Sequence, residues 1–277
     1  MIKLPAWHAH PDVWLLFGSI IAAYLIAARR HLRDTGEATP RRTKRLFVLG
    51  MAVLWLGADW PIHDLAERYL YSVHMVQHIL FTLVAAPLLI AGMPAWLLRR
   101  LLRPKALRVV FAFVTRPLVA LVLFNSVLLF THWPQIVNIA VHSEWIHFGL
   151  HVAIVFAALA MWWPVMSPLP EMPPLSAPGQ MIYLFLESLA PTIPASFLTF
   201  GHTVLYPVYA TFPRIWGISA LTDQLIAGLI MKLVGSAILW GVIGTIFFRW
   251  YGQEQRVQLD ATGYASLDRE IRTELNR

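Results

Sequence analysis

SVHMVQHILFTLVAAPLLIAGMP, residues Ser72 to Pro94, is a long apolar run whose first turns carry His74, Met75 and His78. In a helix His74 and His78 share one face, because the Cβ atoms of residues four apart lie about 5–6 Å from each other. Two imidazoles at that separation can chelate one metal ion. The same spacing recurs in a second apolar run, at His147 and His151. The sequence therefore predicts two membrane helices that each carry a histidine pair.

The composition is that of a polytopic membrane protein. Of the 277 residues 58% are hydrophobic and 13% are charged, with a mean hydropathy of +0.60, whereas about a quarter of a soluble domain is charged. The net charge of +7 does not indicate nucleic acid as a partner, because the basic residues cluster between apolar runs and so carry a topology signal. The chain has no cysteine, which excludes disulfides, thiolate metal ligands and cysteine nucleophiles.

The pattern predicts an all-α integral membrane protein, a seven-helix bundle in one domain over residues 1–250 with a tail over residues 251–277. Each apolar segment approaches the ~20 residues that cross a bilayer. The fourth is short as drawn, and we expect it to begin near Leu107. The segments are Val13 to Ala28, Thr43 to Trp60, Val73 to Ala91, Pro117 to Phe130, Ile146 to Trp163, Met181 to Phe200 and Leu221 to Phe248.

Most lysines and arginines fall in the first and third connections and in the tail, whereas Lys3, Arg68 and Arg214 lie on the opposite side. The positive-inside rule then places the N-terminus outside and the C-terminal tail in the cytoplasm. Cleavage of the first segment as a signal peptide would export its basic flank, so we expect this segment to be retained. With this orientation every histidine except His31 lies at or near the outer face.

The outer histidines are candidate metal ligands. Helices that begin at the outer face point their positive dipole ends at these imidazoles, which favours the neutral form that binds metal. A plainer interpretation is that each histidine is a hydrogen-bonded interfacial side chain and that each methionine only packs. The candidate ligands are His74, Met75, His78, His147, His151, Asp223 and Met231. Asp59, His63, Gln77, His132, Glu144 and Gln224 are candidates to orient them, and Asp64 and Glu67 are further acceptors nearby.

Two charged residues fall within apolar segments, where ionisable groups are costly and usually functional. We hypothesise that Glu187 and Lys232 pair with each other, and that Pro191 and Pro194 interrupt the helix carrying Glu187. A retinal Schiff base on Lys232 is excluded, because the helix of His74 lacks a carboxylate counter-ion and Gly228 stands one turn before the lysine.

The run from Gly57 to Pro94 closely resembles the CtaG-type family of cytochrome c oxidase assembly proteins, named for the caa-type oxidase. Similar signatures follow in the family where this chain has FTHWP (Phe130 to Pro134), IHFGLH (Ile146 to His151), MWWP (Met161 to Pro164), YPVY (Tyr206 to Tyr209) and DQLIAGLIM (Asp223 to Met231). Lys232 departs from the pattern, because the family tends to an aromatic residue there.

The resemblance implies a seven-helix protein of the bacterial cell membrane that helps to mature a haem–copper oxidase, at the step that supplies copper. The implied partners are oxidase subunits, a periplasmic copper chaperone and the lipid bilayer, and no catalytic turnover is expected. The positions that match the family motifs are His74, Met75, His78, His147, His151, Asp223, Gln224 and Met231.

Several alternatives stay open at this point. Imidazole and thioether ligands suit copper, but zinc accepts imidazole too. His78 and His151 on facing helices could ligate a haem b that carries electrons. A zinc-dependent membrane hydrolase would need a general acid or base, for which Asp59 or Glu144 could serve. A scaffold without metal would gather oxidase subunits by helix packing alone.

Overall fold

The computed structural model describes residues 6–275, and the side chains as far as residue 258. Lys3 and Arg277, which entered the topology argument, lie outside the described residues. Every regular element in the described part of the chain is helical, which confirms the all-α class. The helices run α1 (Pro11–Thr35), α2 (Arg41–Ala58), α3 (Ile62–Arg68), α4 (Tyr71–Ile79), η1 (Leu80–Ala85), α5 (Ala86–Ala91), α6 (Ala95–Leu101), α7 (Lys105–Val114), α8 (Pro117–Thr131), α9 (Pro134–Val141), α10 (Glu144–Met166), α11 (Ala177–Leu189), α12 (Thr192–Phe200), α13 (Pro207–Ala210), α14 (Ala220–Leu229), η2 (Ile230–Val234) and α15 (Gly235–Leu275).

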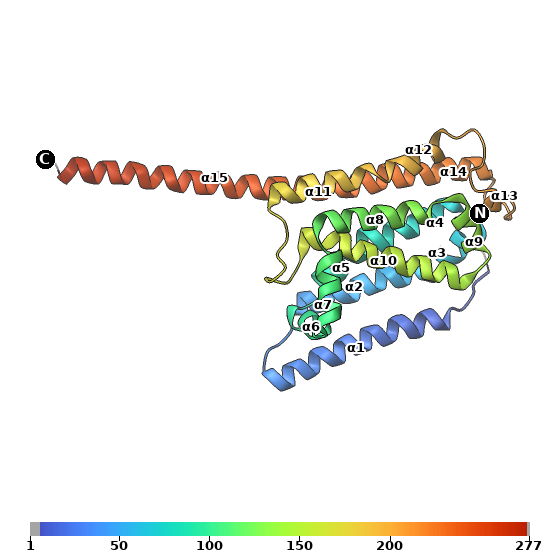
Figure 1. Ribbon diagram of the computed structural model, residues 1–277, viewed down its shortest axis with the longest axis horizontal. Coiled ribbons are helices and arrows are strands. Elements are labelled where there is room, and N and C mark those ends of the chain that lie inside the picture. Colours follow the sequence, from blue (N-terminus) through green and yellow to red (C-terminus); the bar gives the residue numbers. More distant parts are fainter. Residues whose placement is uncertain (1–5, 276–277) are drawn as a thin grey trace.

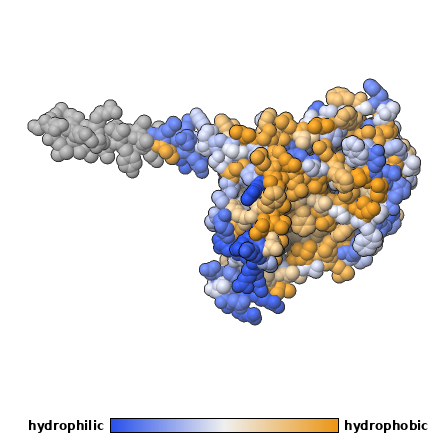
Figure 2. Space-filling view, viewed as in Figure 1, coloured by the Kyte–Doolittle hydropathy of each residue, from blue (hydrophilic) through white to orange (hydrophobic). Residues whose placement is uncertain are grey.

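Six helical stretches in the described part of the chain are long and apolar enough to cross a membrane, or up to seven if the bent pair α7 and α8 is one span. The expectation of seven spans is therefore met only if that pair is counted. Apolar side chains cover the middle of the visible face and hydrophilic ones gather toward its two ends (Figure 2), as a bundle in a bilayer requires. The protein is a membrane protein.

The fourth segment differs from the expectation that it starts near Leu107. Residues from Lys105 form the separate helix α7, which is bent by 79° from α8. Arg116 is extended, with φ −62° and ψ 136°, because the ring of Pro117 disfavours helical geometry in the residue before it. The apolar run is therefore continuous in sequence but not in direction.

The interruption expected at Pro191 and Pro194 is found at Pro191 alone: α11 ends at Leu189 and α12 begins at Thr192, so Pro194 lies in the first turn of α12. Two other spans contain π-helical turns, η1 between α4 and α5 and η2 between α14 and α15. Trp162 of α10 donates its Nε1–H to the carbonyl of Thr82 in η1 at 2.8 Å. Such turns are frequent at functional sites because they re-aim the side chains around them.

The long helices lie along a common direction, with α10 in the interior and α1 at one edge (Figure 1). The short helices α3, α9 and α13 gather at one end, which we call the histidine end, and α6 and α7 lie toward the opposite end. Helix α15 runs unbroken from Gly235 to Leu275 and extends beyond the rest of the bundle. The segment expected as a tail after residue 250 thus continues the last membrane helix.

Candidate metal centre

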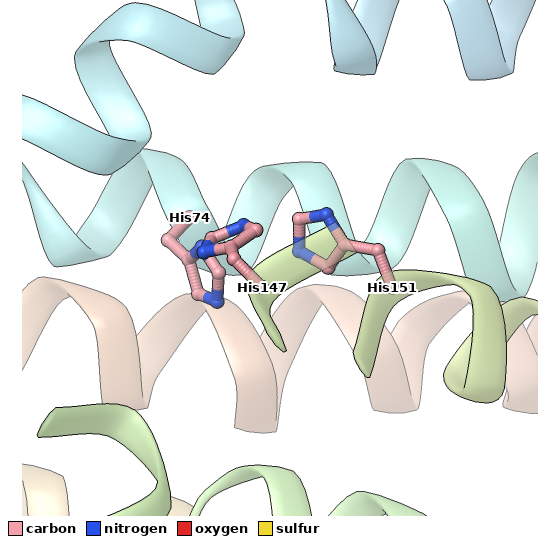
Figure 3. A group of neighbouring side chains, drawn as sticks. All are labelled: His74, His147 and His151. Atoms are coloured by element: carbon pink, nitrogen blue, oxygen red, sulfur yellow. The ribbon is translucent and has the colours of Figure 1, made fainter. Parts of the chain in front are cut away.

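Three imidazoles meet near the histidine end of the bundle. His74 comes from α4, and His147 and His151 come from α10 (Figure 3). One ring nitrogen of each lies within 4.8 Å of the others, and we call these residues the histidine group. Ligand atoms about 2.0–2.1 Å from one metal ion lie at most about 4.2 Å apart, so the three nitrogens are near the spacing that an ion requires.

The group also has free donor atoms. Nδ1 of His74, Nε2 of His147 and Nε2 of His151 are buried and have no hydrogen-bond partner. Buried polar groups are nearly always hydrogen-bonded, so three exceptions in one cluster call for an explanation. A metal ion that accepts these lone pairs would supply it.

The two histidine pairs lie as the i,i+4 spacing predicts. The ring centroids are 4.5 Å apart for His74 and His78 and 4.2 Å apart for His147 and His151. His78 lies beside the group, 5.4 Å from His151 between centroids, and on its other side is His132, at 5.3 Å. His132 closes α8, and its Nδ1 lies 2.7 Å from the carbonyl of Leu128. The imidazoles thus continue from the group toward the interior.

Glu67 contacts the group, although the sequence argument named it only as a nearby acceptor. Its Oε1 lies 3.1 Å from Nε2 of His147 and 3.3 Å from Nε2 of His63. The approach to His147 is within ion-pair distance but lacks hydrogen-bond alignment, because that nitrogen has no hydrogen-bond partner. The short helix α3 carries both His63 and Glu67 and lays them against α10. His63 therefore lies beside the group, with its ring centroid 6.2 Å from that of His147.

Gln77 and Asp59 were also expected to orient the metal ligands. Gln77 contacts His63, whereas Asp59 contacts none of the histidines of the group. Gln77 donates to the carbonyl of Gly57 at 2.7 Å, and its Nε2 lies 3.5 Å from Nδ1 of His63. Asp59 accepts from the indoles of Trp14 and Trp55 at 2.6 and 2.9 Å. The Asp59 carboxylate ties α1 to α2, a structural task that its position in the sequence does not reveal.

Asp223 and Gln224 also have structural partners. The two oxygens of Asp223 accept the backbone N–H groups of Tyr71 and Ser72 at 2.7 and 3.0 Å, so this buried carboxylate caps the N-terminus of α4. Gln224 of α14 accepts from the N–H of Leu205 at 2.6 Å, and Leu205 lies in the connection between α12 and α13. The structure therefore corrects the expectation of Asp223 as a ligand, and neither residue joins the histidine group.

Glu144 is exposed in the first turn of α10. Within the described residues it forms no hydrogen bond or ion pair with a histidine. Met75 and Met231 are buried and line one cavity with His78. The methionines thus lie beyond His78 as seen from the histidine group.

The expected ion pair between Glu187 and Lys232 is not formed. Glu187 is fully buried and accepts from Nδ2 of Asn125 at 2.8 Å. Lys232 holds its ammonium 5.6 Å from the centroid of the Phe200 ring, a cation–π contact. Among the described side chains no ion pair joins them, since each already has a partner on another helix. They do line the same cavity.

The histidines outside this cluster take other roles. His8 and His10 approach the buried carboxylate of Asp64 at 3.5 and 3.0 Å, which fixes the chain before α1 to α3. His31 stacks on Trp96 at the opposite end. His142 and His202 are exposed and lie outside the histidine group.

Comparison with known proteins bears on this arrangement. Uncharacterised proteins of Mycobacterium bovis and Mycobacterium tuberculosis are each 22% identical over 267 residues, which cover 91% of this chain. The chain spans 40% of the length of these curated relatives. No solved structure matches.

A family model matches residues 22–253, which include every helix that contributes to the histidine group. Its description is that of an assembly factor and not of a catalytic enzyme. The match covers most of the chain, and the chain therefore belongs to the cytochrome c oxidase caa3 assembly factor family.

Proposed function

We propose that this protein binds copper through His74, His147 and His151 and supplies it to a cytochrome c oxidase in the bacterial cell membrane. One observation carries the proposal: three ring nitrogens lie within 4.8 Å of one another, and each of these residues has a buried ring nitrogen without a partner. The membership of an oxidase assembly family supports copper as the cargo, because haem–copper oxidases have copper centres to be filled.

The chemistry of the donors fits a delivery protein. Imidazole binds copper well, and no thiolate competes, since the chain has no cysteine. Three ligands leave a coordination position open, through which an acceptor can take the ion. Tyr209 and the four residues His74, His78, His147 and His151 also line a small cavity of about 30 Å³ beside the group.

The site lies at the histidine end, which the positive-inside rule predicts to be outside. The cargo would then be exchanged with a periplasmic copper chaperone and with oxidase subunits that expose their copper centres on that side. Glu67 and His63 are each 24% exposed and lie between solvent and His147. They mark the side from which a donor protein would approach.

The haem alternative fits the site less well. A haem between His78 and His151 needs a wide planar slot, but His74 and His147 fill the space beside these two rings. The two residues named as acid or base for the hydrolase alternative do not serve it, because Asp59 is held by two indoles and Glu144 is exposed. Two further alternatives are zinc as the bound ion and a scaffold that binds no metal. Experiment distinguishes both from copper delivery.

The test replaces the gene in the host with one encoding His147→Ala/His151→Ala. The oxidase is then purified and its copper content is measured per haem. We expect copper-poor oxidase, because two of the three ligands are gone while the exposed side of α10 is untouched. His142→Ala/His202→Ala is the matched control, since it removes two exposed histidines from the same end, and it should give normal copper.

Normal oxidase copper in the double variant, with the variant present at its usual level in the membrane, would contradict the proposal and favour a scaffold. Loss of the oxidase in both the variant and the control would mean that the substitutions disturb the structure of the histidine end, and not that a copper site has been removed.

A further inference from the structure

A second group of soft and imidazole donors lies deeper in the bundle. A cavity of about 50 Å³, room for a few water-sized groups, lies among α4, α8, α10, α11 and the π-helical turns η1 and η2. Its lining includes the thioethers of Met75 and Met231 and the imidazoles of His78 and His132. Glu187 and Lys232 are its charged residues.

His132 is held as metal-binding histidines usually are. Its Nδ1 lies 2.7 Å from the carbonyl of Leu128, to which it can only donate, so the lone pair is on Nε2. That Nε2 is buried and has no partner, and the residue is only 5% exposed. Donation of one ring N–H to a backbone carbonyl fixes the tautomer and aims the other nitrogen, which is the arrangement found behind ligated histidines.

Glu187 adds a buried carboxyl group to the cavity. Its Oε2 accepts from Asn125, but its Oε1 is buried without a partner. The ammonium of Lys232 is placed on the face of Phe200. This carboxyl oxygen lies next to thioethers and imidazoles and is free to contact a cation brought into the membrane interior.

His78 connects the two sets of donors. It lines this cavity and also the smaller one beside the histidine group, and its ring lies between those of His74 and His132, at 4.5 and 5.3 Å. The π-helical turn η1 begins two residues after His78, and η2 contains Met231 and Lys232. Both irregular turns thus border the same cavity.

We infer that this cavity is a second copper site, selective for Cu(I), with His78, His132, Met75 and Met231 as its donors. The inference rests on the proposed function, because that function supplies copper as the ion. The inner site itself is separate from the histidine group. Thioether sulfur favours Cu(I) over the divalent ions that an all-imidazole site accepts. The histidine group would receive Cu(I) from the outside, and the inner site would hold the same ion without a change of oxidation state.

The experiment titrates the purified protein in detergent, without oxygen, with Cu(I) against a coloured Cu(I) chelator, and records X-ray absorption at the copper edge. We expect wild type to bind two ions per chain. His147→Ala/His151→Ala should keep one ion with sulfur ligands. His132→Asn and Met231→Leu, made separately, should each keep one ion with nitrogen ligands alone.

Each substitution preserves the surroundings. An asparagine amide can still donate to Leu128 but offers no second ring nitrogen, and leucine is close to methionine in volume. Met51→Leu is the matched control, because Met51 is equally buried but packs with Tyr24 and Phe47 away from the cavity. It should bind two ions.

Loss of all copper in His147→Ala/His151→Ala, or retained copper without sulfur scattering, would overturn the inner site and leave the proposed function intact. Wild type that binds a single ion through nitrogen alone would do the same. Wild type that binds no copper would remove the proposed function itself.

Discussion

The hydrogen-bonding state of individual ring nitrogens is stronger evidence for a metal site than the presence of histidines alone. A buried donor or acceptor left without a partner costs about 1–3 kcal/mol, and His74, His147 and His151 each contain one. Histidines that only pack at an interface would turn these atoms to water or to a carbonyl, as His142 does with the carbonyl of Asn138. The unpaired atoms of the histidine group therefore fit ligation better than packing.

Glu67 is the residue at this scale whose role is most easily tested. Its carboxylate lies against both His63 and His147, so it adds negative charge beside a cation and orients a ligand. Glu67→Gln keeps the shape and removes the charge. We expect copper affinity to fall by about 10- to 100-fold, as for other residues that orient ligands, measured by competition with a chelator.

Glu37→Gln removes an exposed carboxylate from the connection between α1 and α2, away from the group, and is the control, with unchanged affinity expected. An affinity of Glu67→Gln equal to that of wild type would show that Glu67 does not act on the metal.

Residue spacing revealed part of this site and not the rest. The i,i+4 pairs at His74 and His78 and at His147 and His151 are visible in the sequence because a helix brings such residues together. Glu67 was not chosen as a site residue, because its contact with His147 depends on how α3 packs on α10. The sequence could not show that Asp223 is a helix cap and not a ligand, because the N–H group of Ser72 that it accepts from is 151 residues away.

At the scale of elements, α14 holds α4 in place and so positions His74. Asp223 in the first turn of α14 caps α4, and α14 itself packs closely on α12 at Gly228. A Cβ atom at this glycine would lie 2.5 Å from Oγ1 of Thr199 and 2.9 Å from the carbonyl oxygen of Ala195. A side chain there must push the two helices apart.

Gly228→Ala is therefore expected to destabilise the protein by about 1–3 kcal/mol, the usual cost of overpacking. Thermal unfolding in detergent measures the effect. Gly241→Ala in the same span is the control, since a Cβ atom there meets nothing within 4 Å, and it should be neutral or slightly stabilising. Equal unfolding temperatures for the two variants would contradict the close approach.

The fold class and most spans could be predicted from the sequence, because apolar length alone determines them. The direction of α7 could not, since hydropathy does not register the bend that Pro117 imposes. The ion pair expected between Glu187 and Lys232 was wrong for a related reason. Charge in a membrane segment predicts that a partner exists, but Asn125 and Phe200, the partners found, carry no charge and give no such signal.

For the whole molecule, the orientation in the membrane decides which compartment the histidine group faces, and so which one would exchange copper with it. Arginine and lysine cluster between α1 and α2 and around α6 and α7, at the end opposite the histidine group. Because basic loops stay in the cytoplasm, the histidine end is expected to face the periplasm.

The orientation can be tested by thiol labelling, because the chain has no cysteine of its own that would react. Thr203→Cys and Ala38→Cys place single thiols at exposed positions between α12 and α13 and between α1 and α2. A membrane-impermeant maleimide applied to intact spheroplasts should label Thr203→Cys, and should label Ala38→Cys only after the membrane is opened. The reverse pattern would place the histidine group on the cytoplasmic side.

The most direct test of the account is the metal content of the protein purified in detergent from copper-replete cells, measured by mass spectrometry together with its visible spectrum. We expect at least one copper ion per chain, without a haem band, in wild type, and one copper ion fewer per chain in His147→Ala/His151→Ala. Zinc in place of copper, a Soret band, or equal copper in wild type and the double variant would each contradict it.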